Sequence, residues 1–383
     1  MAAGYPKLRM SVPHTALTYA ISEGGSAYPR PMARIRDLGV MIGTLPTGPN
    51  NAITDVSGVL VGHCTVIHDE PRVARTGVTV ISPRNDRIWE DYAFCAWHNF
   101  NGNGEMTGIP WVEESGMLGS AIGLTNTHQV GLVRDTFVKY SVESGFTDGF
   151  ILPVVAETFD GWLSDIDAFH LEESHVRRAL AALADGPVAE GNVGGGTGMV
   201  CHEFKGGIGT SSRVVAGTWT VGVLVQANYG VRHDLRVDGV PVGRLIDGDE
   251  VPLAYKEPGD IREGSIIVVV GTDAPLIPVQ CRRLAQRATV GLARVGGTGR
   301  NGSGDIFFAF ATGNQLPATT HGLYRLDMVP HEELNPFFDA VADATEEAIL
   351  NALCAAETMR GHRGRTAHAL PHDRVRELLA GSR

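Results

Sequence analysis

A glycine–serine bond lies where a polar loop meets an apolar strand. The loop runs from Glu257 to Gly264, and the five residues that follow Ser265 are all isoleucine or valine. Glycine before the bond removes steric hindrance and tolerates strained backbone angles. The Ser265 hydroxyl can therefore attack the preceding carbonyl, cut the chain and leave serine at a new N-terminus. Its α-amine, with a reference pKa of about 7.7–8.0, would be a base suited to neutral pH.

The same dipeptide occurs at other places, so it is not a specific signal by itself. The other copies are Gly25-Ser26, Gly119-Ser120, Gly302-Ser303 and Gly381-Ser382. Only the copy at 264–265 combines a polar loop before it with a continuous apolar strand after it. The pattern indicates an N-terminal nucleophile, and an ordinary loop-to-strand junction stays open as the alternative.

Two glycine-rich loops suggest a nucleotide site, but each lacks a necessary feature. Gly297–Gly302 fits the pattern G-x-G-x-x-G. A predicted helix precedes it and a strand follows it, which is the reverse of the order in a dinucleotide site. Gly194–Gly198 lacks the G-K-[ST] ending of a phosphate-binding P-loop. We interpret both loops as tight turns beside a site.

Metal and conventional serine-hydrolase motifs are missing from the sequence. Histidine and cysteine are adjacent at His63-Cys64 and at Cys201-His202, and neighbours on a strand point to opposite faces. There is no H-E-x-x-H or C-x-x-C motif, and no serine lies in a G-x-S-x-G elbow. We therefore predict that the protein needs no metal and no organic cofactor.

Short β-branched runs alternate with helical patterns along the chain. The predicted strands are Gly58–Gly62, Val78–Ser82, Ala121–Leu124, Phe150–Val155, Arg213–Gln226, Ser265–Val270 and Asp305–Ala311. The predicted helices are Thr127–Ser141, Ser174–Ala184, Ala274–Leu292 with Asp273 as N-cap, Glu332–Ala356 and Asp373–Leu379. This mixed order, without a Pro/Ser-rich linker, favours one layered α/β domain. We place an N-terminal arm at 1–35, the domain at 36–356 and a C-terminal tail at 357–383.

The composition is that of a globular protein, with 43% hydrophobic and 20% charged residues and a net charge of −11. The negative charge argues against a nucleic-acid partner. The five cysteines are odd in number and widely spread, so no disulfide framework is indicated. No apolar run approaches the ~18 residues of a membrane span, and Pro13 and His14 interrupt any signal-like segment. We expect a cytoplasmic protein.

Several sequence blocks, in order along the chain, resemble the DmpA/BapA family of L-aminopeptidase/D-amidase–esterases and β-peptidyl aminopeptidases. The resemblance runs from about Arg36 to Cys354. Its blocks are Asn51–Val56, Gly58-Val59, Val61–His63, Pro153–Thr158, Gly191–Gly198, Leu224–Gly230, Gly264-Ser265 and Gly302–Asp305. The resemblance implies a self-processed N-terminal-nucleophile hydrolase with an αββα four-layer sandwich, similar to ornithine acetyltransferase. It also implies a precursor cut into two associated chains, and assembly of these units into a homo-oligomer, a tetramer.

The resemblance also implies roles for individual residues. Ser265 would be the nucleophile released by cleavage after Gly264, and Asn228 would donate from its amide to the developing oxyanion. Ser303 and Asp305, two residues apart, would form a hydrogen-bonded relay that orients the nucleophile. Without the resemblance, Asn228 could simply end a strand, and Ser303 and Asp305 could be turn residues.

Two further residues would contact the substrate. Glu157 matches an acid that holds the substrate's free amino group, a charge-assisted contact that selects unblocked N-termini. Phe159 stands where we expect tyrosine in a close relative, so a second side-chain oxyanion donor is missing there. Asp305 stands where some relatives have glutamate, and the shorter carboxylate alters its reach.

We therefore predict an aminopeptidase or amidase that acts on short peptides, amides or esters with a free amine, through an acyl-enzyme on Ser265. Three alternatives stay open. They are an ω-amino-acid oligomer hydrolase of the same construction, ornithine-acetyltransferase-like transfer of the acyl group to an amine, and a catalytically silent binding protein. The preference among L-α, D- and β-residues depends on the shape of the pocket.

Overall fold

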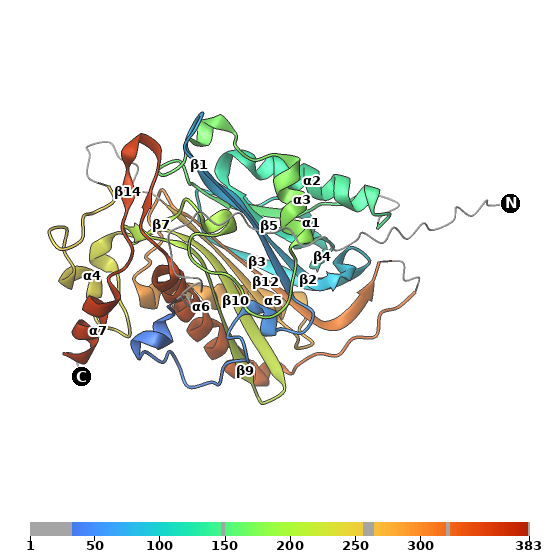
Figure 1. The fold of residues 1–383 in the computed structure, drawn as a ribbon. Coiled ribbons are helices and arrows are strands. Elements are labelled where there is room, and N and C mark those ends of the chain that lie inside the picture. The colour runs from blue at the N-terminus through green and yellow to red at the C-terminus, as the bar shows by residue number, and fades with distance from the viewer. Residues whose placement is uncertain (1–32, 147–149, 256–263, 319–321, 382–383) are drawn as a thin grey trace. The chain divides into compact units, whose positions relative to one another are not determined.

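Two β-sheets pack face to face in the computed structural model, and helices cover the outer side of each (Figure 1). The structure describes residues 33–146, 150–255, 264–318 and 322–381. Most of the expected N-terminal arm, and the loop before Gly264, lie outside the described residues. The layers follow the α-β-β-α order that the resemblance implies.

The larger sheet has six strands in the order β4-β3-β12-β11-β10-β9. Their bounds are β4 Met117–Leu118, β3 Asp91–Gly102, β12 Gly304–Pro317, β11 Ser265–Thr272, β10 Trp219–Asn228 and β9 Gly207–Val215. Helices α5 (Pro278–Val295) and α6 (Asn335–Ala355) cover its outer face. All the strand pairs are antiparallel except β11 with β12, which is parallel.

The smaller sheet has the strand order β1-β2-β5-β6. The bounds are β1 Leu60–His68, β2 Ala74–Asp86, β5 Ile122–Asn126 and β6 Val154–Thr158. Helices α2 (Val130–Glu143) and α3 (Glu173–Ala181) pack on it. The remaining elements are α1 Ile109–Ser115, β7 Val200–Cys201, β8 Phe204–Lys205, α4 Val242–Leu245, β13 Met359–Arg360, β14 Thr366–Ala367 and α7 His372–Ala380.

Strand β11 has an apolar residue at every position after Ser265 up to Val270 because both of its faces are buried. Ile266, Val268 and Val270 belong to the core between the large sheet and its helices. Ile267 and Val269 belong to the core between the two sheets. Since successive side chains of a strand point to opposite faces, Ser265 shares the face of Ile267, and its side chain lies between the sheets.

The predicted strands and helices overlap elements of the structure, but β6 begins at Val154 rather than Phe150, α6 begins at Asn335 rather than Glu332, and β3 was not predicted. Two further predictions need correction. Arg213–Gln226 is not one strand, because Ala216 and Gly217 form a turn between β9 and β10 with φ values of 52° and 66°. Positive φ at both central residues is typical of a tight hairpin, but alanine there is unusual. Helix α5 begins at Pro278 rather than at Ala274. Asp273 does not cap it and instead accepts a hydrogen bond from the Thr220 amide at 2.8 Å.

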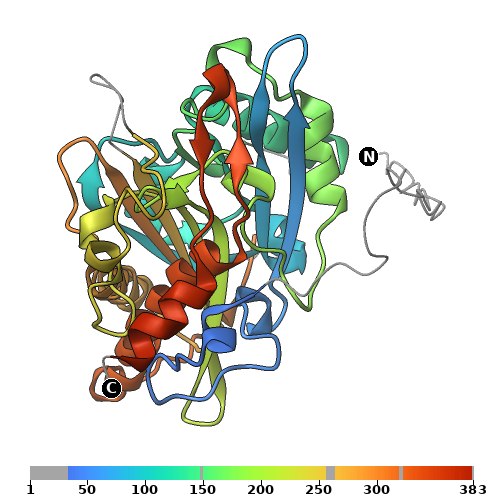
Figure 2. The same ribbon diagram turned by 60° about the vertical axis from the view of Figure 1, so that its left-hand side comes forward.

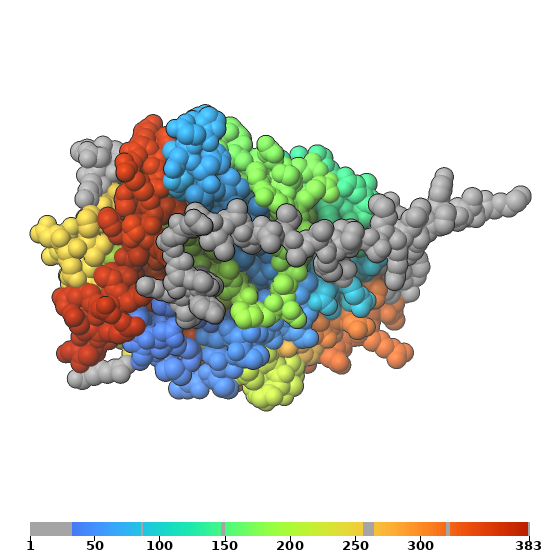
Figure 3. All heavy atoms as spheres, viewed as in Figure 1, coloured from blue at the N-terminus to red at the C-terminus, as the bar shows by residue number. Residues whose placement is uncertain are grey.

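The segment predicted as a C-terminal tail is folded and packed. It forms the β13–β14 hairpin and α7, both coloured red in Figure 2 and exposed on the face shown in Figure 3. Leu370, Val375 and Leu379 lie in the same core as α6. At the other boundary Ile35, which we placed in the arm, is buried, and its amide donates to Asn351 Oδ1 at 3.0 Å. The domain therefore extends beyond 36–356 at both ends. None of its described helices is long and apolar enough to cross a lipid bilayer.

Candidate active site

Three neighbouring strands of the large sheet place polar residues at one end. Strand β10 ends at Asn228, β11 begins at Ser265, and the antiparallel register pairs these two residues. The parallel register of β11 and β12 pairs Ile266 with Asp305, so the start of β12 lies beside the start of β11. Ser303 precedes β12 directly. The structure therefore brings together the four residues predicted for catalysis, and all four side chains are buried.

The peptide bond between Gly264 and Ser265 is contacted from both sides. The Ser303 hydroxyl donates to the carbonyl oxygen of Gly264 and also lies 2.6 Å from Asp305 Oδ1. Ser265 Oγ accepts a hydrogen bond from the Gly304 amide at 3.1 Å. In the intact chain the Ser303–Asp305 pair thus contacts the carbonyl before the junction, whereas the backbone of Gly304 contacts the Ser265 hydroxyl.

Glycine is required before the junction. A Cβ atom at Gly264 would lie 1.7 Å from the carbonyl oxygen of Asn228. No side chain fits at that distance, so the close approach of β10 to this bond depends on glycine. The loop Gly297–Gly302 runs beside the same point, and Gly299 takes a φ of 63°. Our interpretation of that loop as a tight turn beside a site agrees with this placement.

Asp305 is a buried carboxyl group without a cationic partner among the described residues. Burial raises its pKa to about 6, although hydrogen bonds from Ser303 and from the Ile266 amide oppose the rise. A hydroxyl group has only one proton, so Ser303 cannot donate to both Asp305 and Gly264. When Asp305 is protonated it donates to Ser303, and the Ser303 proton is then directed at the carbonyl of Gly264.

A cavity of about 20 Å³ adjoins Gly264, Ser303 and Asp305. This is room for roughly one water molecule. Tyr229 forms part of its wall. Water therefore has a place next to the carboxyl group and the carbonyl of the junction.

The side-chain amide of Asn228 is held in one orientation. Its Oδ1 accepts from the Val200 amide at 2.8 Å, and its Nδ2 donates to the carbonyl of Phe159 at 3.0 Å. A side-chain amide has two N–H groups, so a second hydrogen of Nδ2 is left for another acceptor. Asn228 faces Ser265 across the two strands, as an oxyanion donor must.

Lys205, which was not among the residues predicted from the sequence, fixes the segment that orients Asn228. Its Nζ is fully buried and donates to the carbonyls of Gly196, Met199 and Gly206, at 3.3, 2.9 and 2.7 Å. Met199 precedes Val200, whose amide contacts Asn228. Burial lowers the pKa of Lys205 to about 7. A lysine between Phe204 and a run of glycines is the one signal that could have indicated a buried cation.

Glu157 reaches the site from the smaller sheet, at the end of β6. Its Oε1 accepts from the Glu105 amide at 3.0 Å, and the Thr127 hydroxyl donates to its Oε2. Burial raises the pKa of Glu157 more than these two hydrogen bonds lower it. No lysine or arginine forms an ion pair with it in the part of the chain that the structure describes. It is a buried anion without a matching cation.

Glycine at position 104 keeps the space between Glu157 and the nucleophile open. A Cβ at Gly104 would meet Glu157 Oε1 at 3.2 Å and the Cα of Gly304 at 3.1 Å. Gly304 is the residue whose amide contacts Ser265 Oγ. The carboxylate therefore lies close to the nucleophile, as its predicted role as an amine anchor requires.

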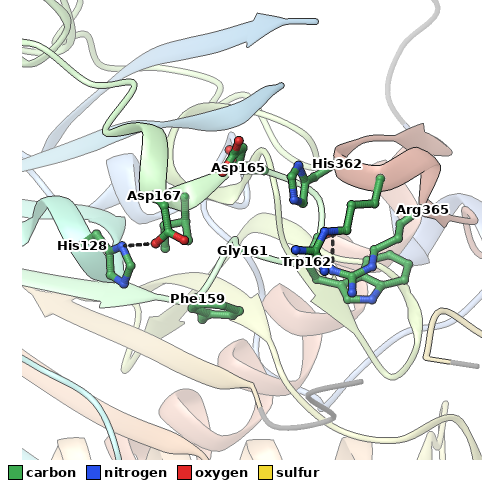
Figure 4. Close-up of a pocket in the computed structure, with 11 residues that line it drawn as sticks. His128, Phe159, Gly161, Trp162, Asp165, Asp167, His362 and Arg365 are labelled. Atoms are coloured by element: carbon green, nitrogen blue, oxygen red, sulfur yellow. Dashed lines mark hydrogen bonds and ion pairs between the residues drawn. The ribbon is translucent and has the colours of Figure 1, made fainter. Parts of the chain in front are cut away.

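Phe159 connects the site to a larger cavity of about 330 Å³ (Figure 4). Its carbonyl accepts from Asn228, and its ring lines the cavity together with Trp162 and His128. The next residue, Asp160, is buried, and burial raises its pKa to about 7. The position where we expected a tyrosine hydroxyl is thus an apolar wall.

Histidines and metal-ligating groups do not converge on this site. Among the described residues, no three histidine, cysteine or acidic side chains form a cluster that could hold a metal ion. Burial lowers the pKa values of His63 and His202 to about 4. Both imidazoles are therefore neutral near pH 7.

A sequence profile of peptidase family S58 matches residues 51–367. The chain is 46% identical over 367 residues to beta-peptidyl aminopeptidase BapA of Sphingosinicella microcystinivorans. The alignment covers 90% of this chain and 91% of that protein. A beta-aminopeptidase structure from Burkholderia sp. is 49% identical, with a TM-score of 0.85, and covers 91% of this chain and 99% of the other.

The structure of L-aminopeptidase D-Ala-esterase/amidase from Ochrobactrum anthropi is 44% identical to this chain, with a TM-score of 0.83. It covers 91% of this chain and 98% of the other, and it is described as a variant of the Ntn hydrolase fold. These similarities confirm the predicted fold class.

Proposed function

Because the chain belongs to peptidase family S58, we propose that it is an aminopeptidase or amidase that activates itself by cutting the bond between Gly264 and Ser265. The observation that carries this proposal is the contact of the Ser303 hydroxyl with the Gly264 carbonyl oxygen. A polarised carbonyl directly before a buried serine is the arrangement that intramolecular attack needs.

Self-cleavage proceeds in two steps. Ser265 Oγ attacks the carbonyl carbon of Gly264 and loses its proton, and the C–N bond breaks as the nitrogen takes a proton. This leaves an ester between Gly264 and Ser265 Oγ, with Ser303 donating to the oxyanion that forms in between. Water then hydrolyses the ester to give the Gly264 carboxylate and a serine with a free α-amine.

In turnover the new α-amine is the base. It takes the proton of Ser265 Oγ while the hydroxyl attacks the substrate carbonyl, Asn228 donates to the oxyanion, and Glu157 holds the substrate ammonium. The amine that leaves takes the proton back, and water releases the acyl group from Ser265. Since Ser303 contacts the carbonyl bonded to the Ser265 nitrogen, Ser303 and Asp305 lie next to the new amine and orient it.

The two fragments, of 264 and 383 − 264 = 119 residues, remain associated in this proposal. Strands β11 and β12 of the second fragment pair with β10 and β3 of the first. Separation would therefore break the middle of a six-stranded sheet. Assembly of such units into a tetramer, and a cytoplasmic location, are further proposals. Size-exclusion chromatography with light scattering tests the assembly.

Removal of the nucleophile tests the proposed function. Intact masses and a denaturing gel should show two fragments for the natural chain, a single chain for Ser265→Ala, and two fragments for the control Ser26→Ala, which alters another Gly-Ser bond. Ser265→Ala should also be inactive. Cutting of Ser265→Ala at the same bond would show that the attack is not intramolecular.

The proposed role of Glu157 has its own test. Glu157→Gln should lower kcat/KM for a free-amine nitroanilide by about 10- to 100-fold, because the ammonium loses its charge-assisted partner, and self-cleavage should continue. The control is Glu105→Gln, which changes an exposed carboxylate next to the site but leaves its backbone amide on Glu157. Equal turnover of acetylated and free-amine substrates would remove Glu157 from the site.

The compared proteins also favour a particular substrate range. Two of them are named beta-aminopeptidases, which supports substrates that begin with a β-amino acid. Rates on β-alanine, L-alanine and D-alanine nitroanilides decide between these classes. Added amine acceptors distinguish hydrolysis from acyl transfer, because a transferase would form a new amide in place of the free acid.

A further inference from the structure

We propose that the cavity beside Phe159 is a subsite that binds a carboxylate group of a short peptide substrate. This carboxylate lies on a part of the substrate other than the bond that is cleaved. The proposal rests on the proposed function and adds a substrate class to it. The cavity of about 330 Å³ is at the small end of ligand pockets. Figure 4 shows its aromatic and charged walls, which come from the loop after β6 and from the turn between β13 and β14.

Two residues that line the cavity lie next to the proposed catalytic site. Phe159 lines it and accepts, through its carbonyl, the hydrogen bond from the oxyanion donor Asn228. His128 also lines it and directly follows Thr127, whose hydroxyl donates to the amine anchor Glu157. A substrate fixed at its amine and at its carbonyl can therefore extend into this space.

The carboxylates that line the cavity already have partners. Asp165 accepts two hydrogen bonds from Arg72, at 2.5 and 2.7 Å. Asp167 Oδ1 lies 3.5 Å from His128 Nδ1, a contact that is dashed in Figure 4 and is an ion pair only when the imidazole is protonated. The bidentate contact neutralises Asp165, which leaves Asp167 as the cavity's remaining negative charge.

Two arginines of the β13–β14 turn supply positive charge to the same space. Arg363 has no ion-pair or hydrogen-bond partner within the described residues. Arg365 lies over the Trp162 ring, with its guanidinium carbon 5.6 Å from the ring centre, and donates to the Trp162 carbonyl at 3.4 Å. Guanidinium groups match carboxylates in geometry as well as in charge.

His362 lies among the charged residues of the cavity. Burial is the main cause that lowers its pKa, and the charges of Arg363, Arg365 and Arg72 lower it further, against the opposing effect of Asp165. Asp165 has the largest of these charge effects, and the three arginines act against it. Two arginines thus line one pocket in a chain of net charge −11, and the rings of Phe159 and Trp162 offer apolar surface to the body of the ligand.

Two parts of a short substrate could supply the carboxylate. One is the C-terminus of the leaving residue, and the other is an acidic side chain on the first residue. The experiment compares a dipeptide with its C-terminal amide, and compares N-terminal glutamate with N-terminal glutamine nitroanilide. The protein is the cleaved enzyme and its variants Arg363→Gln, Arg365→Gln and the double variant.

We expect the natural enzyme to prefer the carboxylate member of one pair by about tenfold, mainly through KM, and salt should weaken this preference. The double variant should lose the preference. The matched control Arg374→Gln removes an exposed arginine of α7 that pairs with Glu250 and Glu377, and it should keep the preference. The pair that responds identifies the source of the carboxylate.

An unchanged preference in the double variant, or no preference in the natural enzyme, overturns the subsite. Failure of the proposed function would give a different result, because the chain would then not be cut at Gly264, or neither member of any pair would be hydrolysed. Complete self-cleavage of each variant shows that it is folded, so loss of preference cannot be attributed to misfolding.

Discussion

Buried carboxylates occur both in helix α6, at Glu347, and at the start of β12, at Asp305. Glu347 accepts hydrogen bonds from Arg36, Asn51 and Arg213 at 2.5–2.8 Å. Asp305 has one hydroxyl partner, Ser303, and one backbone partner. Both groups have lost the same kind of hydration, but only the first is surrounded by cations.

The pKa values of the two groups move in opposite directions. Burial raises that of Glu347 most, but the hydrogen bond from Arg36 and the charge of Arg213 together hold it below its usual value. Burial raises that of Asp305 to about 6, and no cation among the described residues opposes this rise. Glu157 follows Asp305 in this respect, because its pKa is raised as well.

The two kinds of buried carboxylate have different roles, because Glu347 stabilises the fold whereas Asp305 and Glu157 are available for chemistry. In the Glu347 network the buried carboxylate is paired with two arginines of the same chain, so a proton or a ligand cannot be exchanged there at low cost. At the strand ends no cation of the described residues pairs with Asp305 or Glu157, so these carboxylates can accept a proton or an ammonium group from elsewhere. Raised pKa values of this kind are typical of functional sites.

The largest expected effect comes from breaking the matched network. Glu347→Gln should lower the free energy of unfolding by about 3–5 kcal/mol, because Arg213 remains fully buried without its anion. Urea unfolding in a Ser265→Ala background, where the chain stays intact, measures the change. The neighbouring Glu346→Gln is the control, since its partner Arg294 is 44% exposed and such pairs contribute about 0–1 kcal/mol. Equal losses in both variants would contradict the comparison.

Asp305→Asn should raise the free energy of unfolding, whereas Glu347→Gln lowers it. The folded-state pKa of about 6 lies above the ordinary value of 3.8 for an aspartate, so folding favours the protonated carboxyl. Its contribution is full below pH 4 and is lost as the pH rises through 6. Asparagine removes the cost of burying an ionised carboxylate. The free energy of unfolding of the variant should therefore exceed that of the natural chain by on the order of 1–3 kcal/mol at pH 8, and by much less at pH 4.

The same variant should lose turnover. Without the carboxylate next to the new α-amine, kcat should fall by about 100-fold. The control Asp273→Asn changes a carboxyl at the other end of β11, where it accepts from Thr220, and should leave kcat in place. Destabilisation of Asp305→Asn at pH 8 would show that Asp305 belongs with Glu347 rather than with the site.

The sequence predicts one side of this comparison better than the other. Ser265–Val270 could be predicted because a strand buried on both faces is apolar at every position. The match of Glu347 with Arg36 and Arg213 could not, since it depends on residues more than a hundred positions away. An acidic pair in a helix instead suggests a solvent-exposed face. The β9–β10 hairpin could not be predicted, because the positive φ of Ala216 in its turn is rare for alanine.

The site itself was predictable only in part. The loop-to-strand junction at Ser265 is local and visible in the sequence, whereas the roles of Asn228, Glu157 and Asp305 came from the resemblance. Strand register brings Asn228 and Asp305 to the junction, and no local pattern encodes that register. Lys205 was missed for the same reason, because its three acceptors are created by the folded glycine loop.

The smallest expected effect concerns the base. Activity should rise with pH as the α-amine of Ser265 loses its proton, in a range set by its reference pKa of about 7.7–8.0. Lys205 is a second amine whose pKa lies close to this pH range, because burial lowers it to about 7. Burial lowers the pKa values of His63 and His202 to about 4, so both imidazoles are neutral over this whole range. The rising limb should therefore survive replacement of either histidine.

Lys205→Met distinguishes the two amines. Met199 would lose a hydrogen bond and Val200 would hold Asn228 less firmly, so kcat should fall several-fold while the rising limb of the pH profile stays where it was. Rates on a free-amine nitroanilide from pH 5 to 10 measure both quantities in fully cleaved protein. Loss of the limb in Lys205→Met would make the buried lysine the base, and its loss in a His63 or His202 variant would make the base a histidine. Persistence of the limb in all three variants leaves the Ser265 α-amine as the group that must be neutral, since the unmatched Asp305 beside it titrates lower, at about 6.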